Sequence, residues 1–359
     1  MRIPFKAIVL KYSLEALLIH RINVKYRSLK NRKNLTAEQK RSVQDYFKKY
    51  CGHRVSLAWH RYMYSRTGVF SPKYIPTSLY RTELIGRMNR WECVGVFSDK
   101  NLSCLFLPLV KQPHLVVKNQ NGFFYSNGRA ISREEAIQKC WNLSNAIVKP
   151  SLEEGGKGVA SLTVVEGVTN IQGMRVDELF DNYYADFIVQ ERIIQHPDMA
   201  KLNPSSVNTI RVLTYRFDSE VVLLYCVVRI GRKGMVIDNE SQGGISVKIN
   251  TDGTLAKYAY GAPGEEKIET TDEGIVLEGF QIPSYLKIVS LAKECHLQLP
   301  YFRIIGWDFC IDCDGEPLLI EWNSNPDLSQ TANGPAFGEY TDIILSDVYK
   351  QCNTRNSHW

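Results

Sequence analysis

Two carboxylates and one amide recur at hairpin spacing near the C-terminal end of this 359-residue chain. Asp308, Glu321 and Asn323 lie in two apolar runs within residues 303–323, and these runs read as β-strands joined at Asp314-Gly315. Asp-Gly is a favoured pair for a tight hairpin turn. A two-residue turn there places Asp308 directly opposite Glu321, with Cβ atoms about 5 Å apart. Asn323 follows Glu321 by two residues and therefore points to the same face.

Facing carboxylates repel each other unless a cation lies between them. Hard oxygen ligands suit Mg²⁺, which takes its remaining ligands from water and substrate phosphates. The other face of the hairpin is apolar and is expected to be packed, which fixes the register; it carries Trp307, Phe309, Ile311, Leu318, Ile320 and Trp322. The pattern predicts a site for one or two Mg²⁺ ions on Asp308, Glu321 and Asn323. The alternative is a solvated edge face on which the acids coincide.

A glycine-rich stretch about 150 residues upstream could hold phosphate. Lys149 ends the apolar strand 146–149, and Gly155, Gly156, Lys157 and Gly158 precede the strand 159–165. Glycines let backbone N–H groups approach phosphate oxygens, and Lys149 adds positive charge. The stretch is neither a Walker A loop nor G-x-G-x-x-G, and taken alone it is better interpreted as a plain hairpin loop. Together with the magnesium-type set, it predicts a phosphate-binding loop.

Two arginines lie in long β runs between these motifs. Arg211 is in the run 209–217, on the face of Thr209 and Leu213, and Arg229 is at the end of the run 221–230. Arginines on a sheet face beside a triphosphate neutralise charge by bidentate contact. The alternative is that each lies at a sheet rim and pairs with surface acids.

The elements that would position these residues form an α+β layout. Residues 1–66 read as helical and 67–113 as mixed, and from His114 onward β-hairpins and helices alternate without regular βαβ units. Expected helices cover residues 132–143, 175–183, 283–296 and 340–349. Expected strands cover residues 115–118, 123–125, 146–149, 159–165, 186–194, 209–217, 221–230, 245–249, 255–260, 303–313 and 317–323.

Charge and cysteine content exclude several protein classes. Residues 1–50 hold thirteen Lys and Arg against three Asp and Glu, while the rest of the chain is slightly acidic. This distribution argues against a globally basic nucleic-acid binder. Nine scattered cysteines suggest no disulfide framework, so a reducing cytoplasm is expected. Cys310 and Cys313 lie three residues apart on a strand, so their sulfurs should diverge and not form a metal or redox pair.

Residues 2–20 read as a basic amphipathic helix. Charges interrupt its apolar residues, which argues against a secretory signal. Such a helix could lie on the anionic inner surface of a membrane. The alternative is a solvated helix that packs on the body of the protein.

The motifs, in this order, resemble the ATP-grasp superfamily of carboxylate–amine ligases over about residues 114–340. The resemblance implies an ATP-grasp fold of two lobes that clasp ATP, with a small lobe over 114–189, a large lobe over 190–350 and an N-terminal region over 1–113. The residues that resemble ATP-contacting positions are Lys149, Lys118, the glycine loop at 155–158, and the adenine-contacting hinge Gln190, Glu191, Arg192 and Ile193. Asp308, Glu321 and Asn323 look like the metal ligands.

Two further runs are similar to the sugar-transfer-associated branch of that superfamily, which is linked with capsule and exopolysaccharide assembly. They are Ser206–Arg211, which includes the nucleotide-side candidate Asn208, and Gln242–Ile245. The superfamily often has an arginine two residues before the metal aspartate, but this chain has Gly306. Arg211, Arg229 or Lys248 would then stabilise the acyl-phosphate transition state.

The resemblance implies an ATP- and Mg²⁺-dependent ligase that forms an amide through an acyl-phosphate, in cell-surface polysaccharide biosynthesis. Its partners would be a small-molecule or glycan-precursor carboxylate and an amine donor, without nucleic acid, in the cytoplasm or peripherally at the inner membrane surface. Two alternatives share the nucleotide site: an ATP-grasp kinase that phosphorylates a hydroxyl, and a non-catalytic nucleotide-binding scaffold.

Overall fold

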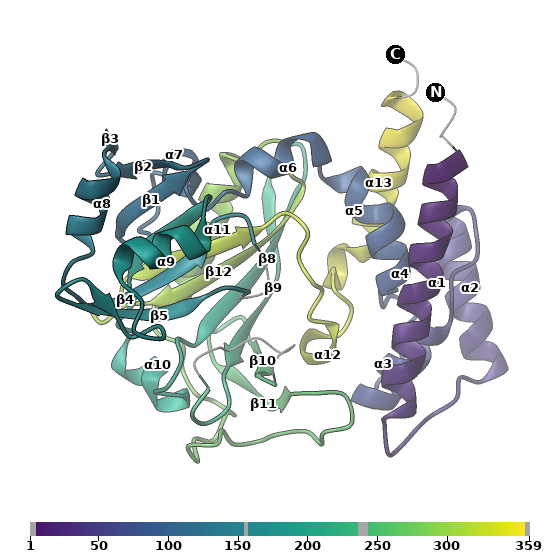
Figure 1. Ribbon diagram of the computed structural model, residues 1–359. Coiled ribbons are helices and arrows are strands. Elements are labelled where there is room, and N and C mark those ends of the chain that lie inside the picture. The colour runs from purple at the N-terminus through teal and green to yellow at the C-terminus, as the bar shows by residue number, and fades with distance from the viewer. Residues whose placement is uncertain (1–4, 154–156, 236–242, 356–359) are drawn as a thin grey trace.

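The computed structural model describes residues 5–153, 157–235 and 243–355, which form two antiparallel sheets and a group of flanking helices (Figure 1). The first sheet has seven strands in the order β3-β2-β1-β7-β4-β5-β6, and the second has six in the order β11-β10-β9-β8-β12-β13. The strands of the first sheet are β1 (Leu115–Gln120), β2 (Phe123–Ser126), β3 (Arg129–Ile131), β4 (Leu143–Pro150), β5 (Ala160–Val165), β6 (Val168–Thr169) and β7 (Phe187–Glu191). Those of the second are β8 (Thr209–Arg216), β9 (Val221–Ile230), β10 (Ile245–Ile249), β11 (Leu255–Tyr260), β12 (Ile304–Ile311) and β13 (Pro317–Asn323).

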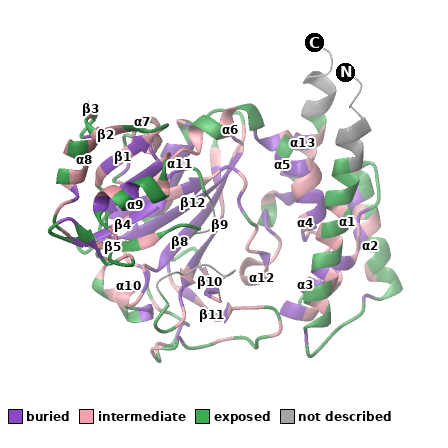
Figure 2. Ribbon diagram, in the orientation of Figure 1, coloured by how far each residue is buried: buried purple, intermediate pink, exposed green. Residues whose placement is uncertain are grey.

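Each sheet is packed on one face by helices and turns part of its other face toward the space between the sheets. Helices α8 (Arg133–Lys139) and α9 (Val176–Tyr183) cover the first sheet, where Ala136 and Phe180 pack with Val117 and Val148. Helix α11 (Tyr285–Leu297) covers the second sheet. Buried residues follow the strands of both sheets (Figure 2). The α+β architecture expected from the sequence is therefore confirmed.

The N-terminal helices and the C-terminal helix lie together beside the second sheet (Figure 1). They are α1 (Phe5–Arg27), α2 (Ala37–Cys51), α3 (Ala58–Thr67), α4 (Thr77–Leu79), the π-helical turn η1 (Tyr80–Leu84), α5 (Ile85–Met88) and α13 (Thr341–Arg355). Phe47 of α2 and Leu345 of α13 pack against Leu213 and Tyr225 of the sheet. These helices cover one half of the inner sheet face and leave the other half to the space between the sheets.

The chain then passes to the first sheet through α6 (Trp91–Phe97) and α7 (Ser103–Phe106). Short helices α10 (Pro197–Leu202) and α12 (Gln330–Asn333) lie in later connections. Helix α11 begins at Tyr285, so Pro283 lies outside it and not in its first turn as expected. The reason is local: Ser284, the N-cap residue, has a left-handed backbone with φ of 51°.

Candidate functional site

The predicted hairpin brings Asp308 opposite Glu321 and Gly306 opposite Asn323. Its turn differs from the prediction, because Asp312 pairs with Glu316 and leaves three loop residues in place of two. A β-bulge compensates: Phe309 pairs with Leu319 and Asp308 with Glu321, so Ile320 is an extra residue. The longer turn shifts the strand pairing by one residue, and the bulge at Ile320 shifts it back. The pairing of Asp308 with Glu321 is therefore the predicted one.

The bulge also changes which residues of β13 reach the core. Leu319, and not Leu318 or Ile320, packs with Trp307, Phe309, Ile311 and Trp322 against α11. Ile320 lines the pocket between the sheets. The expectation that Leu318 and Ile320 share the packed face was therefore wrong, because the extra residue reverses the alternation beyond it. Cys310 is buried and Cys313 is exposed, and neither forms a disulfide within the described residues.

Asp308 is buried at the centre of a cluster of hydrogen-bond donors. Its Oδ1 accepts bonds from Arg211 Nε at 2.6 Å and from an Arg229 terminal nitrogen at 2.8 Å. Its Oδ2 accepts bonds from the Arg211 guanidinium at 2.7 Å and from Asn323 Nδ2 at 3.2 Å. Burial would raise the pKa of Asp308, but the two guanidinium groups outweigh it and hold the pKa below its usual range. The carboxylate is therefore ionised.

Strand order explains this cluster. β8 lies between β9 and β12, so Arg211 of β8 is directly opposite Asp308 of β12, and Arg229 of β9 is opposite Thr209 on the same face. Lys248 of β10 shares this face, but Val227 lies between its strand position and that of Arg211. Arg211 and Arg229 thus contact Asp308, whereas Lys248 lies farther along the sheet.

Gly306 leaves room for the Arg211 side chain. A Cβ atom on Gly306 would lie 2.7 Å from Cβ of Pro326 and 3.4 Å from Cδ of Arg211. The guanidinium of Arg211 thus occupies space beside the position where the resemblance leads us to expect an arginine. Arg211, from a neighbouring strand, supplies the positive charge there.

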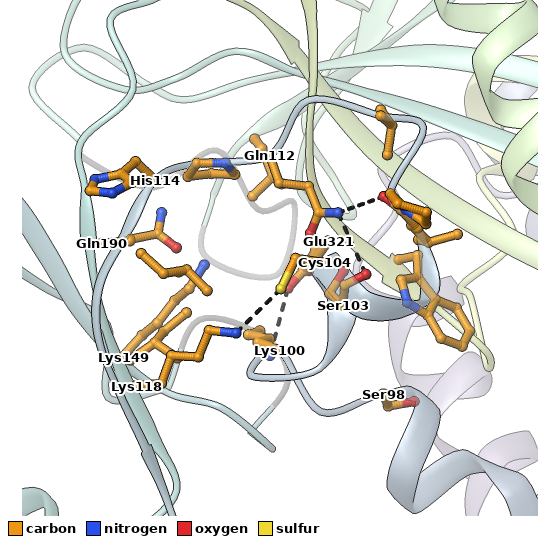
Figure 3. A pocket seen from close by; sticks show the side chains of 18 of the residues that line it. Ser98, Lys100, Ser103, Cys104, Gln112, His114, Lys118, Lys149, Gln190 and Glu321 are labelled. Carbon is orange, nitrogen blue, oxygen red and sulfur yellow. Dashed lines mark hydrogen bonds and ion pairs between the residues drawn. The ribbon is translucent and has the colours of Figure 1, made fainter. Parts of the chain in front are cut away.

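A pocket of about 370 Å³ lies between the two sheets (Figure 3). The first sheet contributes Lys118, Lys149 and Gln190, and the second contributes Glu321 and Asn323. Lys118 and Lys149 both lie opposite Ile188, on the strands that flank β7, so they project from one face of the sheet. The predicted lysines and two of the predicted metal ligands therefore meet across one cavity.

Lys149 is buried and sensitive to its surroundings. The pKa of its amine is lowered to about 8, chiefly by burial; the charge of Glu321 opposes this fall, and the charge of Lys100 adds to it. Lys118 Nζ donates to the carbonyl oxygen of Asn101 at 2.9 Å and contacts Cys104 Sγ at 3.2 Å. An anionic ligand in the pocket would favour the charged form of the Lys149 amine.

Of the other residues predicted to contact the nucleotide, only some line the pocket. Of the hinge residues, Gln190 lines the pocket, while Glu191, Arg192 and Ile193 follow at the end of β7 and are not among the lining residues. Gly155 and Gly156 are outside the described residues. Lys157 and Gly158 are exposed and are not among the lining residues either.

Asn208, predicted to lie on the nucleotide side, uses its side chain within a loop outside the pocket. Its amide donates to the carbonyl oxygens of Met199 at 2.8 Å and Asn203 at 2.9 Å, and to Gln195 Oε1 at 3.0 Å. It is not among the pocket-lining residues. Asn208 therefore holds the connection before β8, because its side-chain donors are used by the loop itself, and a role as a nucleotide contact stays a prediction.

The segment between α6 and β1 also belongs to the site, although its sequence did not predict this. Ser98, Lys100, Cys104 and His114 all line the pocket. Lys100 Nζ lies 3.8 Å from Glu321 Oε2. The segment carries no glycine-rich or carboxylate pattern, so a single sequence offered no signal for it.

The donor set fits Mg²⁺ in its chemistry, since it contains two carboxylates and one amide. Glu321 has about a third of its side chain exposed (32%) and, with Asn323, lines the pocket. Asn323 donates through Nδ2 to Asp308, which leaves its Oδ1 for a cation. Asp308 already accepts four hydrogen bonds and would have to release one to bind an ion. Glu321 and Asn323 are therefore the residues that would hold Mg²⁺ directly.

The family model described as sugar-transfer associated ATP-grasp matches residues 79–342. No curated protein sequence matches the chain. Among solved structures, the chain is similar to D-alanine–D-alanine ligase from Bacillus anthracis, with 15% identity over 75% of this chain and 71% of that one and a TM-score of 0.41. It is also similar to the biotin carboxylase domain of 2-oxoglutarate carboxylase from Hydrogenobacter thermophilus, with 15% identity over 72% of this chain and 48% of that one and a TM-score of 0.43. The chain thus spans about half the length of the second structure.

Proposed function

Since this chain belongs to the sugar-transfer-associated ATP-grasp family, we propose that it is an ATP-dependent ligase that joins a carboxylate to an amine. The observation that carries the proposal is the pocket in which two lysines of one sheet face Glu321 and Asn323 of the other, next to the Asp308 cluster. Lysines and metal-ligand oxygens on opposite walls are the groups that a nucleotide polyphosphate needs.

The proposed reaction proceeds in two displacements. A substrate carboxylate attacks the γ-phosphorus of ATP, which gives an acyl-phosphate and ADP. An amine then attacks the acyl carbon and displaces inorganic phosphate, so that an amide forms. When bound, Mg²⁺ supplies charge neutralisation between the phosphates.

The chain's own residues have distinct tasks in this scheme. Lys118 and Lys149 bind phosphate oxygens from the first sheet, and Gln190 lies on the pocket wall where the base would be held. Arg211 and Arg229 stabilise the charge that develops during phosphoryl transfer. Asp308 holds Arg211 by two hydrogen bonds and Arg229 by a third, so both guanidinium groups are oriented before the substrate arrives.

Tyr80 of η1 adds a polar group close to Arg211. The hydroxyl of Tyr80 is buried there and has no hydrogen-bond partner among the described residues. Burial raises its pKa, while the charges of Arg81 and Arg211 act against that rise. Arg81 donates to the carbonyl oxygen of Asn325 at 2.9 Å and so ties down the loop that follows the metal ligands. An unsatisfied buried hydroxyl beside the arginines suits a carboxylate oxygen.

We further propose that the carboxylate or the amine belongs to a glycan precursor, in keeping with the sugar-transfer description of the family. The test is phosphate release from ATP, measured across a matrix of uronic acids and amino acids, with mass spectrometry of the products. An amide with ADP and phosphate supports the ligase. A phosphoester with ADP contradicts it and indicates a kinase.

The substitution Glu321→Gln keeps the size of the side chain and removes its charge. It should lower ATP turnover by at least a hundredfold, because the oxygen that would hold Mg²⁺ loses its negative charge. Glu316→Gln, on the exposed turn of the same hairpin, is the matched control and should keep wild-type turnover. Unchanged turnover in Glu321→Gln would rule out the proposed site.

A further inference from the structure

Lys100 connects the base of the glycine-rich loop with the proposed metal carboxylate. Its Nζ donates to the carbonyl oxygen of Glu153 at 2.7 Å and reaches that of Ser151 at 3.5 Å. Its backbone N–H also donates to Ser151, at 3.1 Å. The same Nζ lies 3.8 Å from Glu321 Oε2, on the opposite sheet (Figure 3). The side chain is only 14% exposed, so its position is set by these contacts.

The charges in the pocket are unbalanced without a ligand. Among the described residues that line it, Lys100, Lys118 and Lys149 face one carboxylate, that of Glu321. Lys100 and Lys149 are close enough that the charge of Lys100 contributes to the lowered pKa of Lys149. Burying several like charges is unfavourable unless an anion compensates them. A ligand with several negative charges, such as a polyphosphate, would provide that compensation.

The contact between Lys100 and Glu321 is long for an ion pair. A comparable lysine of the same segment, Lys111, lies 2.5 Å from Asp312 on the outer end of the hairpin and does not line the pocket. The strong bonds of Lys100 go to neutral carbonyls, and its charge faces Glu321 without a close bond. Its ammonium group is therefore positioned to exchange one anionic partner for another.

We propose that Lys100 is a third phosphate-binding lysine of this site and that it neutralises Glu321 while the site holds no cation. The inference rests on the proposed nucleotide site and adds a residue from the N-terminal region to it. When ATP and Mg²⁺ bind, the cation takes over the neutralisation of Glu321, and the ammonium group of Lys100 serves the phosphate oxygens.

This role makes two opposite predictions for the loss of the Lys100 charge. Binding of ATP without a divalent cation should weaken, because one charged donor is lost. Binding of Mg²⁺ with ATP should need less Mg²⁺, because the charge that competes for Glu321 is gone. A lysine that only held the loop in place would weaken both.

The experiment measures equilibrium binding of ATP by calorimetry, first with a chelator and then over a Mg²⁺ titration. Lys100→Met keeps the length of the apolar stem and removes the charge. It should weaken Mg²⁺-free ATP binding by about tenfold, the scale of one charge-assisted hydrogen bond, and lower the half-saturating Mg²⁺ concentration several-fold. Lys100→Arg should restore Mg²⁺-free binding to within about threefold of wild type, because it keeps the charge and donor.

Lys111→Met is the matched control and should bind both ligands like the wild type. Wild-type values in Lys100→Met would overturn the role of Lys100 alone, as would weaker ATP binding with an unchanged or raised need for Mg²⁺. If Lys100→Met does not fold, the charge-reducing variant Lys100→Gln is held to the same two readouts. A wild-type protein that binds no ATP would instead overturn the proposed nucleotide site itself.

Discussion

Position 306 carries no side chain, and Pro326 and Arg211 occupy the space beside it. In the Gly306→Ala variant, the new Cβ would lie 2.7 Å from Cβ of Pro326, so one of these groups must move, and it would also contact Arg211 Cδ at 3.4 Å. We expect turnover of ATP to fall by about tenfold or more, because a misplaced charge-stabilising group costs roughly 1–2 kcal/mol of transition-state stabilisation. The affinity for ATP should change less than twofold, since the lysines lie on the other sheet.

Gly95→Ala is the control for this variant. Gly95 lies in helix α6, and a Cβ atom there would meet nothing within 4 Å. It should leave both turnover and nucleotide affinity at wild-type values. Turnover of Gly306→Ala equal to that of Gly95→Ala would show that the position of Arg211 is irrelevant to the reaction.

Some residues of the site could be predicted from the sequence, and others could not. Asp308, Glu321 and Asn323 were accessible because cross-strand pairing within one hairpin follows from local spacing. The meeting of Arg211, Arg229 and Asp308 was not, because it depends on β8 lying between β9 and β12, an arrangement of strands far apart in the chain. Lys100 could not be predicted for the same reason, since only the folded chain brings it close to Glu321.

At the level of elements, a buried hydrogen-bond chain connects α11 to the strand that carries Asp308. The indole N–H of Trp307 donates to Thr214 Oγ1 at 2.8 Å, and this oxygen lies 2.7 Å from Nδ1 of His296. His296 Nε2 lies 3.0 Å from the carbonyl oxygen of Phe302. The carbonyl can only accept, so Nε2 carries the proton and Nδ1 accepts from the threonine hydroxyl. The imidazole is therefore neutral in the fold.

Acid should weaken the fold through His296. Burial lowers the pKa of His296 to about 3, against an ordinary value of 6.5. The unfolded chain takes up a proton below pH 6.5 that the folded chain refuses until near pH 3, so the stabilisation is complete above pH 6.5 and is lost progressively below it. Urea unfolding should show this as a loss of up to about 1.4 kcal/mol per pH unit in that window.

His296→Gln should flatten this pH dependence, because glutamine offers the same donor and acceptor but does not titrate in this range. The free energy of unfolding of the variant is expected to be lower at pH 7, yet it should fall less steeply than that of the wild type between pH 6.5 and 4.5. His20→Gln, at an exposed position of α1, should keep the wild-type slope. Equal slopes in all three proteins would contradict a neutral, buried His296.

Predictions of register and facing from residue spacing hold only where the strands are regular. The hairpin register was right at Asp308 and Glu321 although the turn was one residue longer than expected, because Ile320 forms a bulge that restores it. Alternation is a property of regular strands, so it failed for Leu318 and Ile320 beyond the bulge. The turn at Asn121-Gly122 was predictable because both residues adopt positive φ, which this pair favours.

At the scale of the whole molecule, helix α1 presents two different faces. Ile19 and Ile22 pack with Met63 and Tyr74 of the N-terminal helix group, so the helix is attached to the body of the protein. Much of α1 is exposed (Figure 2), and its exposed residues include an apolar stripe of Leu10 (72% exposed), Leu14 (40%), Leu17 (45%) and Val24 (50%). None of the described helices is long and apolar enough to cross a membrane.

We propose that this stripe and the basic residues around it lie on an anionic membrane surface. Arg21, Lys25 and Arg27 share the helix with the stripe, and residues 1–50 carry ten more basic than acidic side chains. Each Lys or Arg near an anionic bilayer contributes about 1 kcal/mol, and apolar side chains add to this by entering the headgroup region. A membrane therefore complements both features of the exposed face.

Vesicle sedimentation tests this proposal. The full chain should sediment with vesicles that contain phosphatidylglycerol and remain in solution with pure phosphatidylcholine, and 0.5 M salt should release it because the attraction is screened. Replacing Leu10, Leu14 and Leu17 with serine should reduce the bound fraction several-fold without affecting stability, since all three are exposed. The matched control replaces Val276, Leu286 and Ile343, which are exposed elsewhere, and should bind like the wild type. Equal sedimentation of the two triple variants would show that α1 does not contact the bilayer, and the exposed stripe would then belong to the solvated surface of the helix group.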